Sequence, residues 1–209
     1  MITINTNDND FSSNYKLLIG GVLPRPIAAV STLNLDGSNN LAPFSFFTGV
    51  SAKPLILAIC PLVRTSDLSQ KDTTKNILRE KEFVINIVSF QIAEQINNCS
   101  SELKYGEDEF KFSKLTPIES ETIRAKRIKE SLIHYECVLK DYISYGDHAG
   151  AGNLITGEVK RVHIAEAIYE DGKINAKNLD PVARGSGNDW LKYSDTFEMQ
   201  RHMKAQIQK

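Results

Sequence analysis

The chain has 209 residues, of which 41% are hydrophobic and 24% charged, values typical of a globular protein with a buried core. Its 25 basic and 26 acidic residues leave a formal net charge of −1, which gives no broad field to attract nucleic acid or anionic lipid. No apolar run approaches the roughly 20 residues of a membrane span, and residues 1–9 are polar without a basic start. These features predict a cytoplasmic protein that binds neither nucleic acid nor a membrane.

The first part of the chain contains short apolar runs separated by turn-forming residues. The first run is rich in small and β-branched side chains and leads into Asp36-Gly37, a dipeptide that suits a tight hairpin turn. We expect strands over residues 26–35, 41–45, 47–51 and 55–60. Short strands in succession predict antiparallel sheet.

Two short helices and a strand are expected in the middle of the chain. Asp72 or Thr73 can cap the first helix, which carries apolar Ile77 on one side. The apolar run 83–88 predicts a buried strand. The second helix is indicated by apolar residues at helical spacing, Ile92, Ile96 and Cys99.

The polar segment 101–113 predicts a surface loop that can act as a lid. Two long strands are expected over 131–145 and 154–168, with a glycine-rich turn between them. Residues 178–202 show little periodicity and indicate an arm docked on the rest of the protein.

Many short antiparallel strands favour a barrel over a parallel α/β sheet. The prediction is therefore one mainly β domain over residues 1–209 with helical inserts. Its core covers about 23–170, and its C-terminal arm covers about 178–209.

Sequence patterns for several common chemistries are missing. The chain has no phosphate-binding loop of the nucleoside triphosphatases and no Gly-x-Ser-x-Gly elbow. The histidines are too scattered to indicate a metal site. The three cysteines lack Cys-x-x-Cys spacing and are expected to be reduced and mostly buried. We predict no metal ligand, and no neighbouring residue marks one of the cysteines as catalytic.

A run of aromatic and hydroxyl side chains in the second expected strand is a candidate ligand site. Its residues are Ala42, Pro43, Phe44, Ser45 and Phe46. Backbone groups and hydroxyls can reach the polar edge of a flat ligand while the phenylalanines form apolar walls. The alternative is that these aromatic residues are only part of the barrel core.

Charged and hydroxyl side chains stand before and at the start of the first central helix. They are Arg64, Lys71, Asp72 and Thr73, with Asn76 one turn further on. Free backbone N–H groups and the helix dipole would add to the two cations, so this pattern predicts a phosphate site. The alternative is a helix cap with two solvated cations.

A histidine in the expected turn 146–153 is a third candidate. His148 can donate a hydrogen bond to a ligand edge or stabilise negative charge there, because histidine changes protonation near neutral pH. The alternative is a loop histidine exposed to water.

In this order and spacing, these segments resemble the flavin reductase-like family, whose members have an FMN-binding split barrel related in fold to pyridoxamine-phosphate oxidases. The matching segments are 24–28 (PRPIA), 40–47 (NLAPFSFF), 71–73 with Asn76, 83–86 (FVIN), 146–148 (GDH) and 157–159 (GEV). Residues 181–184 followed by Tyr193 are similar to the closing segment of the family. The resemblance implies an antiparallel split β-barrel of the Greek-key type with short flanking helices and a docked C-terminal arm.

The resemblance also implies a homodimer with one FMN per barrel near the subunit interface. Residues 42–46 would contact the ring and ribityl chain, with Ser31 or Thr32 close by. Arg64, Lys71 and Thr73 would bind the phosphate, supported by Asn76, and Asp72 in the same segment is also assigned to the cofactor site. Arg184 and Tyr193 would cover the flavin from either subunit.

The activity implied by the resemblance is transfer of a hydride from NADH or NADPH to FMN. The electrons would leave to free flavin, a ferric complex, oxygen or another small-molecule acceptor. Because the flavin carries the redox chemistry, the resemblance implies no catalytic side chain. Two alternatives stay open. The protein can be an FMN-binding electron carrier or store without NAD(P)H turnover, or a binder of haem or another small molecule on the same barrel.

Overall fold

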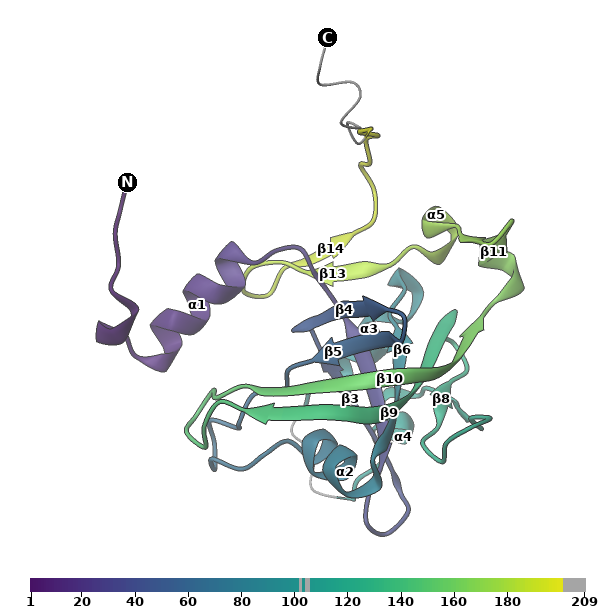
Figure 1. The fold of residues 1–209 in the computed structure, drawn as a ribbon, viewed down its shortest axis with the longest axis horizontal. Coiled ribbons are helices and arrows are strands. Elements are labelled where there is room, and N and C mark those ends of the chain that lie inside the picture. The colour runs from purple at the N-terminus through teal and green to yellow at the C-terminus, as the bar shows by residue number, and fades with distance from the viewer. Residues whose placement is uncertain (102, 104–105, 201–209) are drawn as a thin grey trace.

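A large antiparallel sheet is the centre of the computed structural model, which describes residues 1–101, 103 and 106–200 (Figure 1). In this part of the chain the largest sheet has seven strands in the order β3-β2-β6-β9-β10-β5-β4. The strands are β2 (Ala28–Leu33), β3 (Asn39–Phe44), β4 (Phe47–Ala52), β5 (Leu55–Ile59), β6 (Glu82–Ile87), β9 (Ile133–Ser144) and β10 (Asn153–Ile164). All of their pairings are antiparallel, as predicted.

Short helices and small sheets surround this sheet. The helices are α1 (Phe11–Gly21), α2 (Asp72–Glu80), α3 (Ala93–Asn98), α4 (Glu109–Ser113) and α5 (Ala176–Leu179), with 3-10 turns at Thr6–Asp8, Phe90–Ile92 and Glu166–Ile168. The minor strands are β1 (Arg25–Pro26), β7 (Pro117–Ile118), β8 (Arg127–Ile128), β11 (Tyr169–Glu170), β12 (Lys173–Ile174), β13 (Val182–Arg184) and β14 (Trp190–Lys192). No helix in the described ranges is long and apolar enough to cross a membrane.

Apolar residues pack on both faces of the sheet, so β2 is buried on both sides. Ala28 and Val30 join the cluster built around Phe83, whereas Ala29 faces the opposite cluster, which contains Phe110. The second cluster attaches α3 and α4 to the sheet beside the edge strand β3. Packing therefore brings α3 and α4 to the same edge at which α2 contacts β2 and β3.

Two sequence predictions were wrong in their detail. Residues 109–113 form α4 instead of a surface loop, because Asp108 caps this helix and Phe110, 1% exposed, anchors it in the core. Residues 102 and 104–105 of the predicted lid lie outside the described residues. The strand predicted over 154–168 ends at Ile164, which pairs with the first residue of β9. The chain then leaves the sheet in the 3-10 turn Glu166–Ile168.

Helix α1 was not predicted, and its Leu18 lines a hollow together with residues of β4 and β5. In Figure 1 the helix lies near β13 and β14. Arg25, which is 5% exposed, connects these elements. Its Nη1 donates to the carbonyl oxygens of Ile19 (2.7 Å) and Val22 (2.8 Å), and its Nη2 donates to that of Gly185 (2.8 Å). The C-terminal arm is thus paired with β1 through β13 and held to the end of α1 by one guanidinium.

Candidate functional site

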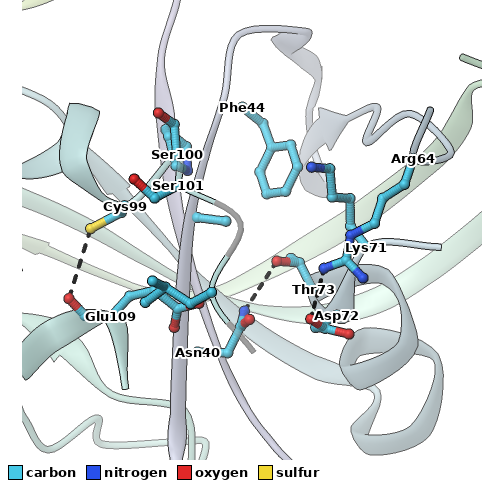
Figure 2. Close-up of a pocket in the computed structure, with 13 residues that line it drawn as sticks. Asn40, Phe44, Arg64, Lys71, Asp72, Thr73, Cys99, Ser100, Ser101 and Glu109 are labelled. Atoms are coloured by element: carbon cyan, nitrogen blue, oxygen red, sulfur yellow. Dashed lines mark hydrogen bonds and ion pairs between the residues drawn. The ribbon is translucent and has the colours of Figure 1, made fainter. Parts of the chain in front are cut away.

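A pocket lies between β3, the start of α2 and the segment that follows α3 (Figure 2). We call it the strand–helix pocket. Several residues predicted to bind a cofactor line it, namely Ala42, Pro43, Phe44, Arg64, Lys71, Asp72 and Thr73. In Figure 2 Phe44, Lys71 and Arg64 face Ser100 and Ser101 across the cavity. The structure therefore brings the predicted aromatic strand and the predicted phosphate site to one cavity.

The start of α2 supplies hydrogen-bond donors to this pocket. Lys71 is the N-cap residue of α2, and its side chain makes no capping hydrogen bond. The first N–H groups of a helix have no partner within the helix, and the helix dipole makes this end positive. This end of α2 is therefore suited to bind an anion.

Arg64 lies in the pocket wall with its guanidinium only partly satisfied. Its Nη2 donates to Asp72 Oδ2 over 2.8 Å, and its Nη1 donates to Ser69 Oγ over 3.3 Å. Its Nε is buried and has no hydrogen-bond partner among the described residues. A buried donor without an acceptor is costly, so an acceptor bound in this pocket would stabilise Arg64.

The opposite side of the pocket carries two ionisable groups, the half-buried Glu109 and the buried Cys99. Burial raises the pKa of Glu109, whose Oε2 accepts a hydrogen bond from the Leu41 N–H over 3.0 Å. Burial also raises the pKa of the Cys99 thiol to about 11, so this group is protonated at neutral pH. Cys99 Sγ donates to the carbonyl oxygen of Gln95 over 3.3 Å. A protonated thiol in this setting is a poor nucleophile.

A buried polar network behind the pocket holds Thr73 in place. Thr32 Oγ1 accepts hydrogen bonds from Asn40 Nδ2 (2.9 Å) and from Asn76 Nδ2 (3.0 Å). Asn40 Nδ2 also donates to Thr73 Oγ1 over 3.1 Å. Ser31 donates its hydroxyl to the carbonyl oxygen of Lys126. The network therefore connects β2, β3 and α2 beneath the pocket.

Three of the predicted cofactor-binding residues lie behind the pocket and do not form its wall. Ser31, Thr32 and Asn76 are each at most 1% exposed and do not line the strand–helix pocket. Thr32 and Asn76 belong to the chain of hydrogen bonds that holds Asn40 and Thr73, whereas the Ser31 hydroxyl donates to a backbone carbonyl oxygen. Direct contact of these three predicted residues with a cofactor stays a prediction.

A second pocket adjoins the first, and we call it the arginine pocket. The two pockets share Pro43 and Ser100 as lining residues. The arginine pocket is also lined by Tyr15, Arg25, Ser45, Asn97, Arg184 and Trp190. It contains two of the predicted cofactor-binding residues, Ser45 and Arg184.

The remaining predicted residues lie elsewhere. Phe46 lines a third hollow together with Ser45, Leu18 and Val22. His148 is exposed in the loop between β9 and β10, and Tyr193 is 41% exposed. Neither of them lines any of these three hollows.

Sequence reasoning missed several pocket residues. Asn40 and Arg25 lie within segments that carry the family resemblance, but no sequence feature assigns either of them to the site. Ser100 and Glu109 reach the pocket only because α3 and α4 pack against each other and against β3. No local pattern marks them.

The described residues contain no cluster of three or more His, Cys, Asp or Glu side chains that could hold a metal ion.

A family model described as the flavin reductase like domain matches residues 20–177. Nitrilotriacetate monooxygenase component B from Bacillus cereus is 37% identical, with 95% of this chain and 98% of that chain covered and a TM-score of 0.90. The 2-nitrobenzoate 2-nitroreductase NbaA of Pseudomonas fluorescens is 27% identical, with 97% and 98% covered and a TM-score of 0.85.

A third structure supports the fold alone. It contains a split barrel domain, comes from Shewanella frigidimarina, and is 21% identical over 94% of this chain and 96% of that chain, with a TM-score of 0.80. The predicted antiparallel split barrel is thereby confirmed. The family model and the 37% identical relative together show that this chain belongs to the flavin reductase-like family of oxidoreductases.

Proposed function

We propose that this protein is an FMN-dependent oxidoreductase that takes a hydride from NADH or NADPH. The electrons would then leave to free flavin, a ferric complex or another small acceptor. The observation that carries the proposal is the strand–helix pocket, in which cations and a helix start adjoin an aromatic edge strand. A flat ring with a phosphate at its far end has the chemistry that this combination recognises.

The phosphate end of FMN would fit against residues at the start of α2 and before this helix. Arg64 has a buried Nε–H without an acceptor among the described residues, and Lys71 adds a second positive charge at the start of α2. Thr73 brings a hydroxyl that is held by Asn40. Each charge-assisted hydrogen bond to a phosphate is worth about 1.5 to 3 kcal/mol.

The ring end fits the open edge of β3, which pairs with β2 on one side only. The Leu41 N–H points to the other side, where it donates to Glu109. Alternate residues of a strand direct their backbone groups to the same edge, so the Pro43 carbonyl also faces this side. Proline has no N–H, so this residue offers an acceptor to a ring N–H without leaving a donor unpaired.

Bound FMN would supply the redox chemistry, and the protein would supply binding, orientation and a dry environment. Phe44 and Pro43 give the apolar wall that excludes water from the ring. Arg64, Lys71 and Thr73 fix the phosphate and so set the position of the ring along β3. In this proposal no side chain forms a covalent bond to substrate.

We further propose a cytoplasmic homodimer with the flavin near the interface. Support comes from the apolar side chains that α1 leaves exposed beside the third hollow, where Leu18 is 45% exposed and Val22 is 56% exposed. Burying such a face against a second copy is favourable.

The proposal is tested with the purified protein before and after it is loaded with FMN. We expect a flavin spectrum and rapid loss of the visible flavin absorbance when NADH or NADPH is added without air. A flavin that only dithionite bleaches would instead identify an electron carrier. A haem spectrum, or failure to retain added FMN, would contradict the proposal.

A further inference from the structure

The arginine pocket contains two guanidinium groups, and no carboxylate neutralises either of them in the described part of the chain. Arg25 donates only to neutral acceptors, three carbonyl oxygens and, over 3.4 Å, Ser45 Oγ. Arg184 Nη2 donates to the carbonyl oxygen of Gly187 over 2.6 Å. Its guanidinium lies 5.3 Å from the centre of the Trp190 ring. None of these contacts neutralises charge.

The lining of this pocket is unbalanced in charge. None of the described residues that line it is aspartate or glutamate, whereas the strand–helix pocket contains Asp72 and Glu109 beside its two cations. Burial lowers the pKa of Arg25, Tyr15 opposes this shift, and the neighbouring Arg184 charge makes a smaller contribution that lowers the pKa. Like charges in a partly dry cavity repel each other, so a bound anion would stabilise the pair.

The two arginines differ in what they can offer a ligand. Arg25 is 5% exposed and fixed by its contacts to α1 and β13, so it acts as an immobile charge. Arg184 is less buried and has one hydrogen bond among the described residues, so most of its N–H groups can still donate. A guanidinium of this kind can bind a carboxylate or phosphate with two parallel hydrogen bonds.

We propose that the arginine pocket binds the anionic group of the substrate that exchanges electrons with the flavin, and that Arg184 selects for it. The inference rests on the proposed function, because it takes the adjoining strand–helix pocket as the flavin site. Pro43 and Ser100 line both pockets, so molecules in the two pockets would lie next to each other. Trp190 and Tyr15 add aromatic walls. The shared chemistry is a carboxylate or a phosphate, from an aromatic acid or from a nicotinamide dinucleotide.

The test compares Arg184→Met, which keeps an apolar stem next to Trp190, with Arg184→Lys, which keeps the charge. Binding to the FMN-loaded protein is measured by calorimetry for NADP⁺, ADP, benzoate and neutral benzamide. NADP⁺ carries the dinucleotide phosphates but has no hydride to transfer, so the heat reports binding alone. We expect Arg184→Met to weaken the anionic ligand about tenfold or more, with partial rescue by Arg184→Lys. Benzamide binding should not change.

A matched control is Arg161→Met, which removes an exposed arginine of β10 outside both pockets. Loss of NADP⁺ and ADP binding in Arg184→Met identifies the dinucleotide phosphate, and loss of benzoate binding identifies a carboxylate. The inference is overturned if no anionic probe binds, or if Arg184→Met binds every probe as the parent does. It is also overturned if FMN affinity falls by the same factor, because Arg184 would then hold the flavin.

Failure of the proposed function gives a different result. A protein that retains no FMN would contradict the function, and inorganic pyrophosphate binding to the flavin-free protein would still test the arginine pocket. Pyrophosphate can also bind the cations of the strand–helix pocket, so the comparison is made in proteins that carry Arg64→Ala and Lys71→Ala. Equal pyrophosphate affinity with and without Arg184→Met in that background would refute the anion site by itself.

Discussion

Arg64 Nη2 lies 2.8 Å from Asp72 Oδ2, so a cation expected to bind phosphate already has a carboxylate partner inside the pocket. Asp72 orients the guanidinium and at the same time places a negative charge where a phosphate would come. Asp72 Oδ1 is also 3.2 Å from Lys75 Nζ on the exposed side of α2. The carboxylate therefore links the pocket to the first turn of the helix.

Asp72→Asn is expected to tighten FMN binding about threefold to tenfold, or by about 0.7 to 1.4 kcal/mol. The amide oxygen can still accept from Arg64, whereas the repulsion between carboxylate and phosphate is removed. Fluorescence titration of the flavin-free protein measures the affinity, and riboflavin, which has no phosphate, should bind both proteins equally. Weaker FMN binding in the variant would show that orientation of Arg64 matters more than repulsion.

Arg64→Ala and Lys71→Ala are each expected to weaken FMN binding about tenfold or more while the barrel stays folded. Each removes one charge-assisted hydrogen bond to the phosphate, worth about 1.5 to 3 kcal/mol. The control is Lys173→Ala, on the exposed β11–β12 hairpin. Thermal unfolding by circular dichroism checks the fold, and unchanged FMN affinity would remove the residue from the phosphate site.

The strands were predictable because apolar runs and turn residues alternate along the chain. Helix α1 was not predictable, because it buries little apolar surface. Only Ile19 of α1 is buried, while Leu17 and Leu18 remain 44% and 45% exposed. Without a buried stripe the helix leaves little periodic signal. Its end is stabilised by Arg25, a contact that no local pattern reveals.

The site was predictable where its residues are neighbours in sequence. Arg64, Lys71 and Thr73 stand near a helix start, and that context indicates a phosphate site without any tertiary information. Ser31 and Thr32 show the limit of this reasoning. Because β2 is buried on both faces, its sequence pattern does not show which side chains reach a cavity. In the structure the Ser31 and Thr32 hydroxyls both bond to groups within the protein.

Gly157→Ala is expected to destabilise the protein by about 1 to 3 kcal/mol, because the core around Gly157 has no room for a methyl group. A Cβ atom at Gly157 would lie 2.4 Å from Phe83 Cζ and 3.0 Å from Cys137 Cβ. Both neighbours are fully buried, so they cannot move aside into solvent. Urea unfolding measures the change, with Gly49→Ala as the matched strand control, since nothing lies within 4 Å of a Cβ there. Equal stability of the two variants would contradict this reading of the core.

A buried carboxylate on β9 predicts acid sensitivity. Glu136 accepts hydrogen bonds from the backbone N–H groups of Glu121 (2.8 Å) and Thr122 (2.7 Å), from the Thr122 hydroxyl and from His163 Nε2 (2.7 Å). Burial alone would raise the pKa of Glu136, but these hydrogen bonds outweigh it and lower the pKa to about 2. Arg127 Nε lies 3.9 Å away and adds a favourable charge.

Glu136→Gln is expected to cost about 3 kcal/mol of unfolding free energy at pH 7. The ordinary pKa of a glutamate is 4.5, so the ionised form stabilises the fold above that pH. This contribution is lost as the pH falls from about 4.5 toward about 2, and the two proteins should become equally stable there. Burial lowers the pKa of His134 to about 3, which weakens both proteins below about pH 6.5, so only their difference is diagnostic. Urea unfolding across this pH range measures the stability of both proteins, with Glu170→Gln on the exposed hairpin as control. A stability difference between Glu136→Gln and the parent that did not change with pH would refute the lowered pKa of Glu136.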